Sequence, residues 1–142
     1  MKLSEMMLAT CACACIRNAS RVVTRAYDEF LRGSGLKASQ LAVLAAINAL
    51  ERASISELSK ALFMDRTTLS RNLKPLVAQG LVTLGEEGWR RSKTMHITPT
   101  GQALLKAAVP LWKHAQEDLA RRLGDTRWKQ MHAELRDLIA AY

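Results

Sequence analysis

The segment from residue 65 to residue 80 constrains the fold most, because it has the pattern of one helix with a marked beginning and end. Asp65 can cap the first turn, since its carboxylate accepts hydrogen bonds from free backbone N–H groups. Gly80 suits the position after the last turn, because glycine adopts a left-handed conformation without a Cβ clash. One side of the segment is apolar at helical spacing and predicts a buried face, formed by Leu69, Leu73, Leu76 and Val77.

The opposite face of this helix carries hydroxyl groups and cations and, between residues 66 and 78, no carboxylate. Such a face can enter the major groove of DNA, although on its own it is more typical of a solvated surface. The preceding segment favours the DNA interpretation. Residues 54–63 predict a short helix with the capping-box spacing from Ser54 to Glu57, and only residues 63–65 link it to the next helix. This arrangement predicts a helix-turn-helix.

The segment that follows predicts a hairpin. Residues 80–84 and 94–98 have the composition of two short strands, and residues 85–93 between them contain two glycines and three cations. A helix-turn-helix followed by a basic hairpin is a winged helix-turn-helix.

The remaining helices are longer than a small winged core can cover. Their surplus apolar stripes predict a second copy of the chain as partner, hence a two-fold homodimer. The expected helices run from about residue 6 to 32, from 40 to 50 with Ser39 as cap, from 99 to 123 with Thr98 as cap, and from Asp125 as cap to the C-terminal end.

Taken in order, these pieces resemble the MarR family of bacterial transcription regulators. The matching segments are LKASQLAVL (36–44), ISEL (55–58), DRTTLSR (65–71), QGLV (79–82), and Arg90 and Arg91 followed by ITPTG (97–101). The resemblance implies a mainly α fold, a winged helix-turn-helix with a two-stranded β-wing and N- and C-terminal dimerisation helices. We expect a single domain over residues 1–142, with residues 36–101 as the DNA-binding core and residues 1–35 and 102–142 as dimerisation helices.

The candidate DNA contacts lie on the predicted recognition helix and wing. Arg71 is the first candidate, because a guanidinium can form two hydrogen bonds to guanine. Arg66 and Lys74 can hold phosphates, and Thr67, Thr68 and Ser70 can donate to phosphates or touch a thymine methyl group. Two recognition helices about 34 Å apart meet successive major grooves, so the predicted partner is double-stranded DNA with a pseudo-palindromic operator.

The wing departs from the family pattern at one position. In the family, the arginine of an Asp-x-Arg signature enters the minor groove, and Arg91 matches that arginine. Trp89 stands where the aspartate is expected, so Glu86 or Glu87 would have to supply the carboxylate. Arg90 and Lys93 complete the predicted basic tip.

Composition agrees with a nucleic-acid partner. The chain of 142 residues has 21 Lys and Arg against 13 Asp and Glu, a formal net charge of +8, which suits a polyanion. No apolar run approaches the roughly 20 residues of a membrane span, so we expect a cytoplasmic protein without a membrane partner. The sequence has no glycine-rich phosphate loop, no paired catalytic carboxylates and no Ser/His/Asp set. We therefore expect that the protein is not an enzyme and binds no cofactor.

Three cysteines within five residues, Cys11, Cys13 and Cys15, allow three interpretations. They can be small packing residues of the dimer core. They can be redox-sensing thiols, which requires exposure and a thiolate-stabilising environment. They can bind a thiophilic ion, although a helix would place Cys13 nearly opposite the other two. The three histidines are scattered, and no metal site is predicted from them.

Members of the family bind small aromatic or phenolic ligands between the dimerisation helices and the winged motif. The resemblance makes Trp112 and His114 candidate lining residues, and plain packing is the alternative. We therefore predict a homodimeric, sequence-specific DNA-binding regulator, a repressor released by a small ligand or by thiol modification. The alternative is a winged-helix module that binds a protein, or RNA, and no operator.

Overall fold

The computed structural model describes residues 1–85 and 94–142, which form a mainly helical chain. Its elements in order are α1 (Leu3–Thr10), α2 (Ala12–Leu31), the 3-10 turn η1 (Arg32–Ser34), α3 (Ala38–Leu50), β1 (Ala53–Ser54), α4 (Ile55–Leu62), α5 (Arg66–Ala78), β2 (Val82–Leu84), β3 (Thr94–Ile97), α6 (Pro99–Leu123) and α7 (Asp125–Ala140).

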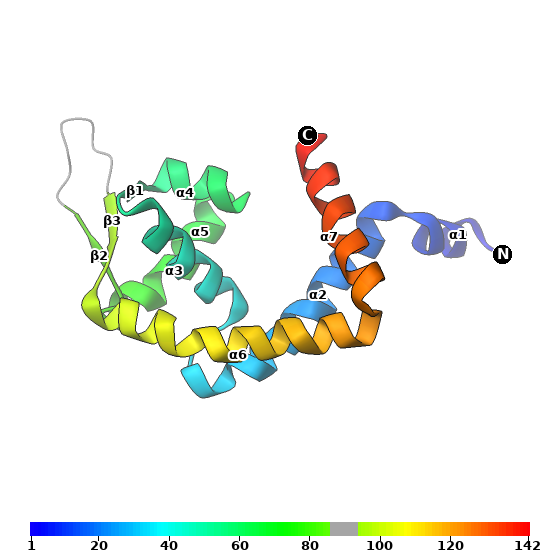
Figure 1. Ribbon diagram of the computed structural model, residues 1–142. Coiled ribbons are helices and arrows are strands. Elements are labelled where there is room, and N and C mark those ends of the chain that lie inside the picture. The colour runs from blue at the N-terminus through cyan, green and yellow to red at the C-terminus, as the bar shows by residue number, and fades with distance from the viewer. Residues whose placement is uncertain (86–93) are drawn as a thin grey trace.

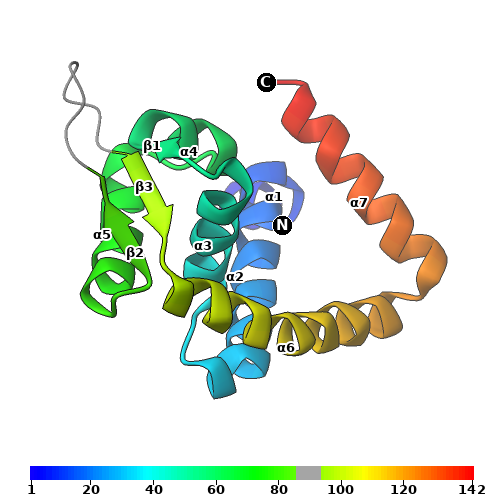
Figure 2. The ribbon, with the colours of Figure 1, turned by 60° about the vertical axis from the view of Figure 1, so that its left-hand side comes forward.

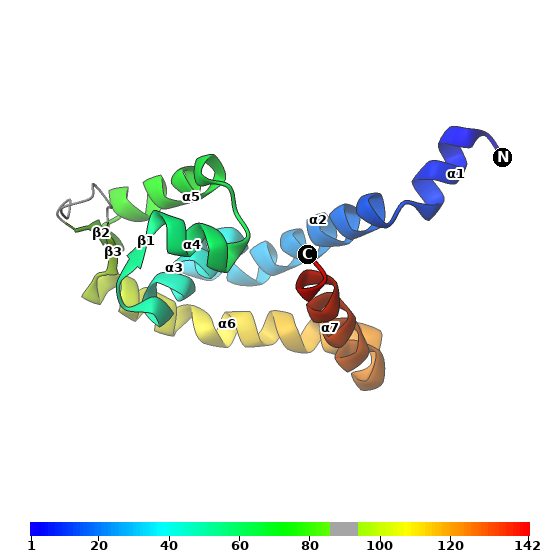
Figure 3. The same cartoon turned by 90° about the horizontal axis from the view of Figure 1, so that it is seen from above.

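The elements from α3 to β3 form one compact part, which we call the winged part, and the long helices α2 and α6 extend from it (Figure 1). Helices α2 and α6 pack against each other, and α6 also packs against α3. At the far end of α6 the chain turns sharply and α7 runs back from it (Figure 2), and α1 lies at the far end of α2 (Figure 3). None of the described helices is long and apolar enough to cross a lipid bilayer.

The core lies in the winged part, where the predicted apolar face of the residue 65–80 helix is confirmed. Leu69, Leu73 and Leu76 of α5 are buried, and Val77 packs partly buried beside them. They meet α3, whose apolar residues face the same core and are also buried, namely Leu41, Val43, Leu44 and Ile47.

The sheet has three strands rather than the two predicted from the sequence. Strands β2 and β3 pair antiparallel, with Val82 opposite Ile97 and Leu84 opposite Met95, as expected for the wing hairpin. The additional strand β1 has two residues and pairs antiparallel with β3, which gives the order β1-β3-β2. A strand this short has no alternating pattern of its own and exists only through its pairing with β3.

Three of the predicted helix boundaries are wrong. The predicted first helix is two helices, α1 and α2, separated at Cys11, whose extended backbone (ψ 111°) interrupts the helical run. Helix α3 begins at Ala38, before Ser39, and its first N–H groups bond to side chains of other residues: Ala38 N–H donates to Asp28 Oδ1 (2.7 Å). Asp125 is the first residue of α7 and not its cap, because Gly124 holds that position with φ of 84°.

Other boundaries are confirmed. Helix α6 ends at Leu123, and Thr98 caps it by accepting a hydrogen bond from Gly101 N–H (3.0 Å). Pro99 stands in the first turn, where its missing N–H has no helical partner to lose. Gly101 is buried against the carbonyl group of Leu81, so α6 starts in close contact with the base of the wing.

The terminal helices carry apolar side chains that nothing in the single chain covers. Helices α1 and α7, both described throughout, have no buried residue. Leu8 of α1 is 75% exposed and Ile139 of α7 is 52% exposed. The surplus apolar surface expected from the sequence is therefore present on these two helices.

Candidate nucleic-acid interface

Helix α4, the first helix of the helix-turn-helix, begins with the predicted capping box. Glu57 N–H donates to Ser54 Oγ (3.1 Å), and Ser54 N–H donates to Glu57 Oε2 (2.8 Å). The hydrogen bond from the Ser54 backbone stabilises the carboxylate and lowers the pKa of Glu57. This reciprocal cap fixes the start of α4 directly after β1.

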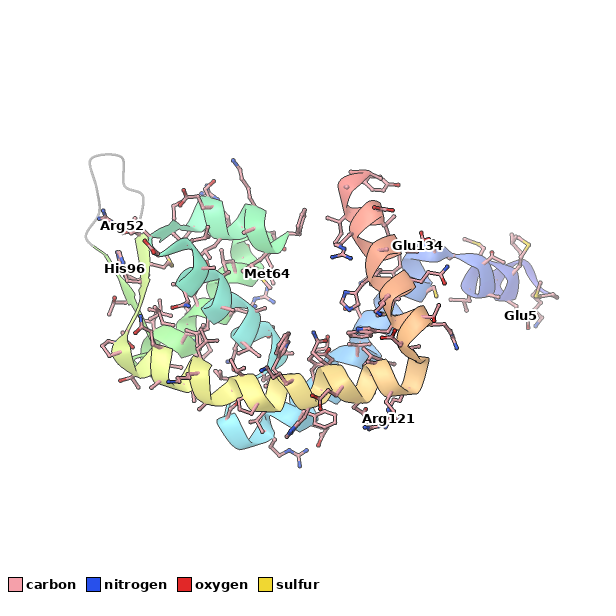
Figure 4. All side chains as sticks on the ribbon, viewed as in Figure 1. Glu5, Arg52, Met64, His96, Arg121 and Glu134 are labelled. Carbon is pink, nitrogen blue, oxygen red and sulfur yellow. The ribbon has the colours of Figure 1, made fainter. Side chains whose placement is uncertain are left out.

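The turn between α4 and α5 is held by backbone hydrogen bonds. Phe63 adopts a left-handed conformation (φ 52°, ψ 35°), which lets Met64 N–H donate to the Ser59 carbonyl (3.1 Å). Ser59 Oγ also donates to the Met64 carbonyl. Met64 is partly buried against the core, so its side chain anchors the turn (Figure 4).

Helix α5 begins at a firm cap, as predicted. Thr68 N–H donates to Asp65 Oδ1 (2.8 Å), and this hydrogen bond is the main reason that the pKa of Asp65 is lowered. The Thr68 hydroxyl donates to Asp65 Oδ2 (2.9 Å) and is partly buried. Thr68, one of the predicted DNA contacts, therefore uses its donor inside the protein, and its hydroxyl oxygen remains as an acceptor only.

The other predicted residues of α5 share one solvent-exposed face. This face, which we call the reading face, consists of Arg66, Thr67, Ser70, Arg71 and Lys74. It lies opposite the buried Leu69, Leu73 and Leu76, so the packing of α5 determines which side chains it presents.

Helix α5 runs without a break through Pro75 to Ala78. It ends at Gly80 (φ 69°), where Leu81 N–H donates to the Leu76 carbonyl (2.9 Å) and Gly80 N–H to the Val77 carbonyl (3.0 Å). These two bonds are the Schellman pattern expected of a left-handed glycine after a helix. Both ends of the reading face are thus held by hydrogen bonds.

The predicted contacts of the wing tip, Arg90, Arg91 and Lys93, lie outside the described residues, as do Trp89, Glu86 and Glu87. The described strands β2 and β3 lead into that tip. Arg52, directly before β1, is exposed and lies beside the wing strands near His96 of β3 (Figure 4). Sequence reasoning did not single out Arg52, because β1 is too short to be recognised from a pattern.

A cleft of about 460 Å³ lies between α2, α3 and α6. Its lining includes the candidate Trp112, which is 38% exposed, whereas the candidate His114 is exposed on α6 outside the lining. Tyr27, which the sequence analysis missed, lines the cleft, and its hydroxyl donates to Gln116 Oε1 on α6. Burial raises the pKa of Tyr27, so the phenol stays neutral at physiological pH. The rest of the lining is apolar, from Ala38, Leu41, Ala42, Ala45, Leu105 and Val109.

The three cysteines lie where α1 meets α2, and all three are free and exposed in the single chain. Cys11 occupies the break itself, and Cys13 and Cys15 lie in the first turns of α2. Within residues 1–85 and 94–142, no three His, Cys, Asp or Glu side chains are grouped to hold a metal ion.

Comparisons with known proteins agree with this geometry. The family model described as the MarR family matches residues 34–92. The transcriptional regulator MosR of M. tuberculosis is 36% identical over 94% of this chain and 96% of that chain, with a TM-score of 0.83. Its structure in complex with DNA is 36% identical over 92% and 95% of the two chains, with a TM-score of 0.82. A comparison with curated proteins gives no match.

A more distant structure shares the fold. A cysteine-to-serine mutant of MarR from E. coli, complexed with operator DNA, is 22% identical over 97% of this chain and 99% of that chain, with a TM-score of 0.83. The winged helix-turn-helix geometry, the matched family model and the 36% identity over nearly the full length lead to one conclusion. The chain belongs to the MarR family of DNA-binding transcription regulators, which are not enzymes.

Proposed function

We propose that two copies of this chain form a repressor that binds a pseudo-palindromic operator and is released by a small ligand or by modification of its thiols. The observation that carries the DNA-binding part is the reading face of α5. This face is exposed, contains no carboxylate, and is fixed at one end by Asp65 and at the other by Gly80. A helix whose backbone is already fixed at both ends loses little backbone conformational entropy when it enters a groove.

Each side chain of the reading face has a proposed role. Arg71 lies in the middle of the face, where its guanidinium can reach a guanine edge. Arg66 and Lys74 flank it and can neutralise phosphates, and Thr67 and Ser70 can donate to the backbone or contact a base. The wing arginines Arg90 and Arg91, together with Lys93, are proposed from the sequence to add charge at the minor groove.

The homodimer is supported by the uncovered apolar surface of α1 and α7. A monomer would leave the large apolar side chains of both helices exposed to water, and soluble proteins usually bury such groups. Pairing the terminal helices of two chains would cover these side chains and would leave the two reading faces free. Crystal structures of MosR and of the MarR mutant contain DNA, which supports an operator as the partner here.

The cleft supports release by a ligand and narrows the ligand's chemistry. None of the described residues lining it is cationic, and its one phenol is neutral. An aromatic carboxylate would enter without a counter-charge and would lose its hydration, which is costly. The cleft therefore favours an uncharged aromatic molecule, with Trp112 and the alanines of α3 against its ring.

The cysteines support release of DNA by modification of their thiols. All three thiols are exposed in the single chain, and the interruption at Cys11 adjoins α1, one of the two helices that carry the uncovered apolar surface. A change of geometry at this joint would alter how the two copies meet. The spacing of the two reading faces depends on that geometry, and with it the affinity for DNA.

Selection from a random DNA pool tests the core of this proposal. The wild-type protein should enrich duplexes with two inverted half-sites about 10 base pairs apart, and sedimentation should find two chains on each duplex. Recovery of no preferred sequence, or of a single half-site bound by one chain, would overturn the proposal. The recovered duplex, referred to below as the selected duplex, then serves for all further binding measurements.

Two ligands that differ only in a carboxylate test whether an uncharged aromatic molecule releases the DNA. An uncharged phenol should bind the wild-type protein and release the selected duplex, whereas the corresponding hydroxybenzoate should do so much more weakly. Ala42→Phe should abolish phenol binding by filling the cleft, and Ala107→Phe, at an exposed position of α6 outside the cleft lining, is its control. Equal release by both ligands would contradict the argument from charge.

A further inference from the structure

The residue that follows α4 has a backbone conformation that is unfavourable for its side chain. Helices α4 and α5 both end in the Schellman pattern, which needs a left-handed residue directly after the helix. After α5 that residue is Gly80, and after α4 it is Phe63. A bulky side chain in this conformation is strained, and Phe63 and Glu51 are the two non-glycine residues with positive φ among those described.

Packing does not explain the presence of this phenylalanine. Its side chain is 77% exposed, so it contributes little to the core that its neighbour Met64 helps to fill. A glycine would make the same backbone hydrogen bonds without the strain. Strain that the fold does not need points to a use of the ring at the surface.

The position of Phe63 indicates what that use is. It lies three positions before Arg66, the first residue of α5, so the two Cα atoms are at most roughly 11 Å apart. The turn lies at the end of the winged part away from β2 and β3, and α5 runs from the turn toward those strands (Figures 1 and 3). Phe63 is therefore exposed close to the N-terminal end of the reading face, the end that reaches base edges in helix-turn-helix proteins.

We propose that Phe63 is a specificity-determining residue of the interface, whose ring contacts the methyl group of a thymine in each half-site of the operator. An apolar ring is suited to this methyl group, which distinguishes thymine from the other bases in the major groove. The left-handed backbone at residue 63 directs the ring outward while Met64 anchors the turn inside. This proposal deepens the proposed function and rests on operator binding by α5.

The first test is Phe63→Gly measured on the selected duplex. Removing the ring should weaken binding about four-fold for each half-site, the effect of losing one buried methyl contact, and roughly 15-fold for the full duplex. The same substitution relieves the left-handed strain, so the thermal melting temperature should stay equal or rise. Weaker binding by a more stable protein is a result that a purely structural role of Phe63 would not give.

Two further variants control for the backbone and for the ring. Phe63→Asn tolerates the left-handed conformation and lacks an apolar ring, so it should bind as weakly as Phe63→Gly. Phe63→Tyr keeps the ring and should bind nearly as the wild type does. If Phe63→Gly binds as tightly as wild type, or if it dissociates the dimer in sedimentation, the proposal is overturned; in the latter case Phe63 is a protein contact.

Deoxyuridine substitution in the selected duplex identifies the contacted base. Replacing the thymines one pair at a time should weaken wild-type binding at one symmetric pair of positions, and this loss should vanish for Phe63→Gly. Equal losses for both proteins at every position would overturn the thymine contact. The outcome differs from failure of the proposed function, in which the wild-type protein would select no duplex at all.

Discussion

Gly101→Ala is the substitution whose effect the structure defines most sharply. Gly101 lies in the first turn of α6 and is buried. A Cβ atom there would penetrate the carbonyl oxygen of Leu81 and lie 2.8 Å from Ile97 Cγ1. The Leu81 carbonyl oxygen is a backbone atom, so it cannot move away by a side-chain rotation. Helix α6 must therefore shift away from the base of the wing.

The expected loss of unfolding free energy follows from the contacts that such a shift of α6 would disturb. Overpacking of this kind costs about 1–3 kcal/mol. The shift also strains two hydrogen bonds of Thr98, from its N–H to the Leu81 carbonyl (3.0 Å) and from Oγ1 to the Gly80 carbonyl (2.6 Å), each contributing about 1 kcal/mol. Alanine gains about 1 kcal/mol over glycine inside a helix. The free energy of unfolding should therefore fall by about 2–4 kcal/mol.

Urea denaturation at one fixed protein concentration measures this change, because the stability of a dimer depends on concentration. Gly33→Ala is the matched control. There the new Cβ would lie 3.9 Å from Leu111 Cδ1, an ordinary contact, so its unfolding free energy should stay within about 0.5 kcal/mol of wild type. A Gly101→Ala protein as stable as the Gly33→Ala protein would refute the reasoning from close contact.

Three other predictions concern stability, assembly and signalling. The carboxyls of Glu57 and Asp65 have lowered pKa values in the folded protein, so their contribution to stability is present above their unfolded pKa values and is lost as pH falls through the folded ones. The difference in unfolding free energy between wild type and the Glu57→Gln/Asp65→Asn double variant should shrink as pH falls below about 4, and a difference independent of pH would contradict the capping account. A chain ending at Leu123 lacks α7 and should aggregate or unfold in sedimentation and melting experiments, whereas a well-folded monomer would argue against the dimer. If a cysteine senses oxidant, peroxide should release the selected duplex from wild type but not from the triple Ser variant of Cys11, Cys13 and Cys15, and matching release curves would end the oxidant-sensing hypothesis.

The parts of the fold that can be predicted well are those encoded by neighbouring residues. The cap at Asp65, the left-handed Gly80 and the buried stripe between them depend on side chains a few positions apart, so helix α5 and its reading face can be predicted from the sequence. The same holds for the capping box of α4 and for Thr98 at the start of α6. Local hydrogen-bonding chemistry alone decides these positions.

The predictions that failed depend on contacts distant in the chain or on conformations without a sequence marker. Helix α3 starts early because Asp28, ten residues upstream, accepts from its first N–H, which no capping pattern near Ser39 reveals. Strand β1 exists through pairing with β3, about forty residues away. The left-handed Phe63 stands where glycine would have been the marker, and Cys11 interrupts a helix with neither glycine nor proline beside it.

The affinity of Arg71→Ala for the selected duplex tests most directly the claim that the exposed face of α5 reads the operator. Arg121→Ala is the control of equal charge, because Arg121 is exposed on the half of α6 away from α5 (Figure 4). Arg71→Ala should weaken binding by about 1–3 kcal/mol and relax the preference at one base position, while Arg121→Ala should bind within about two-fold of wild type. If Arg71→Ala binds with the affinity and base preference of wild type, the exposed face of α5 does not read the operator.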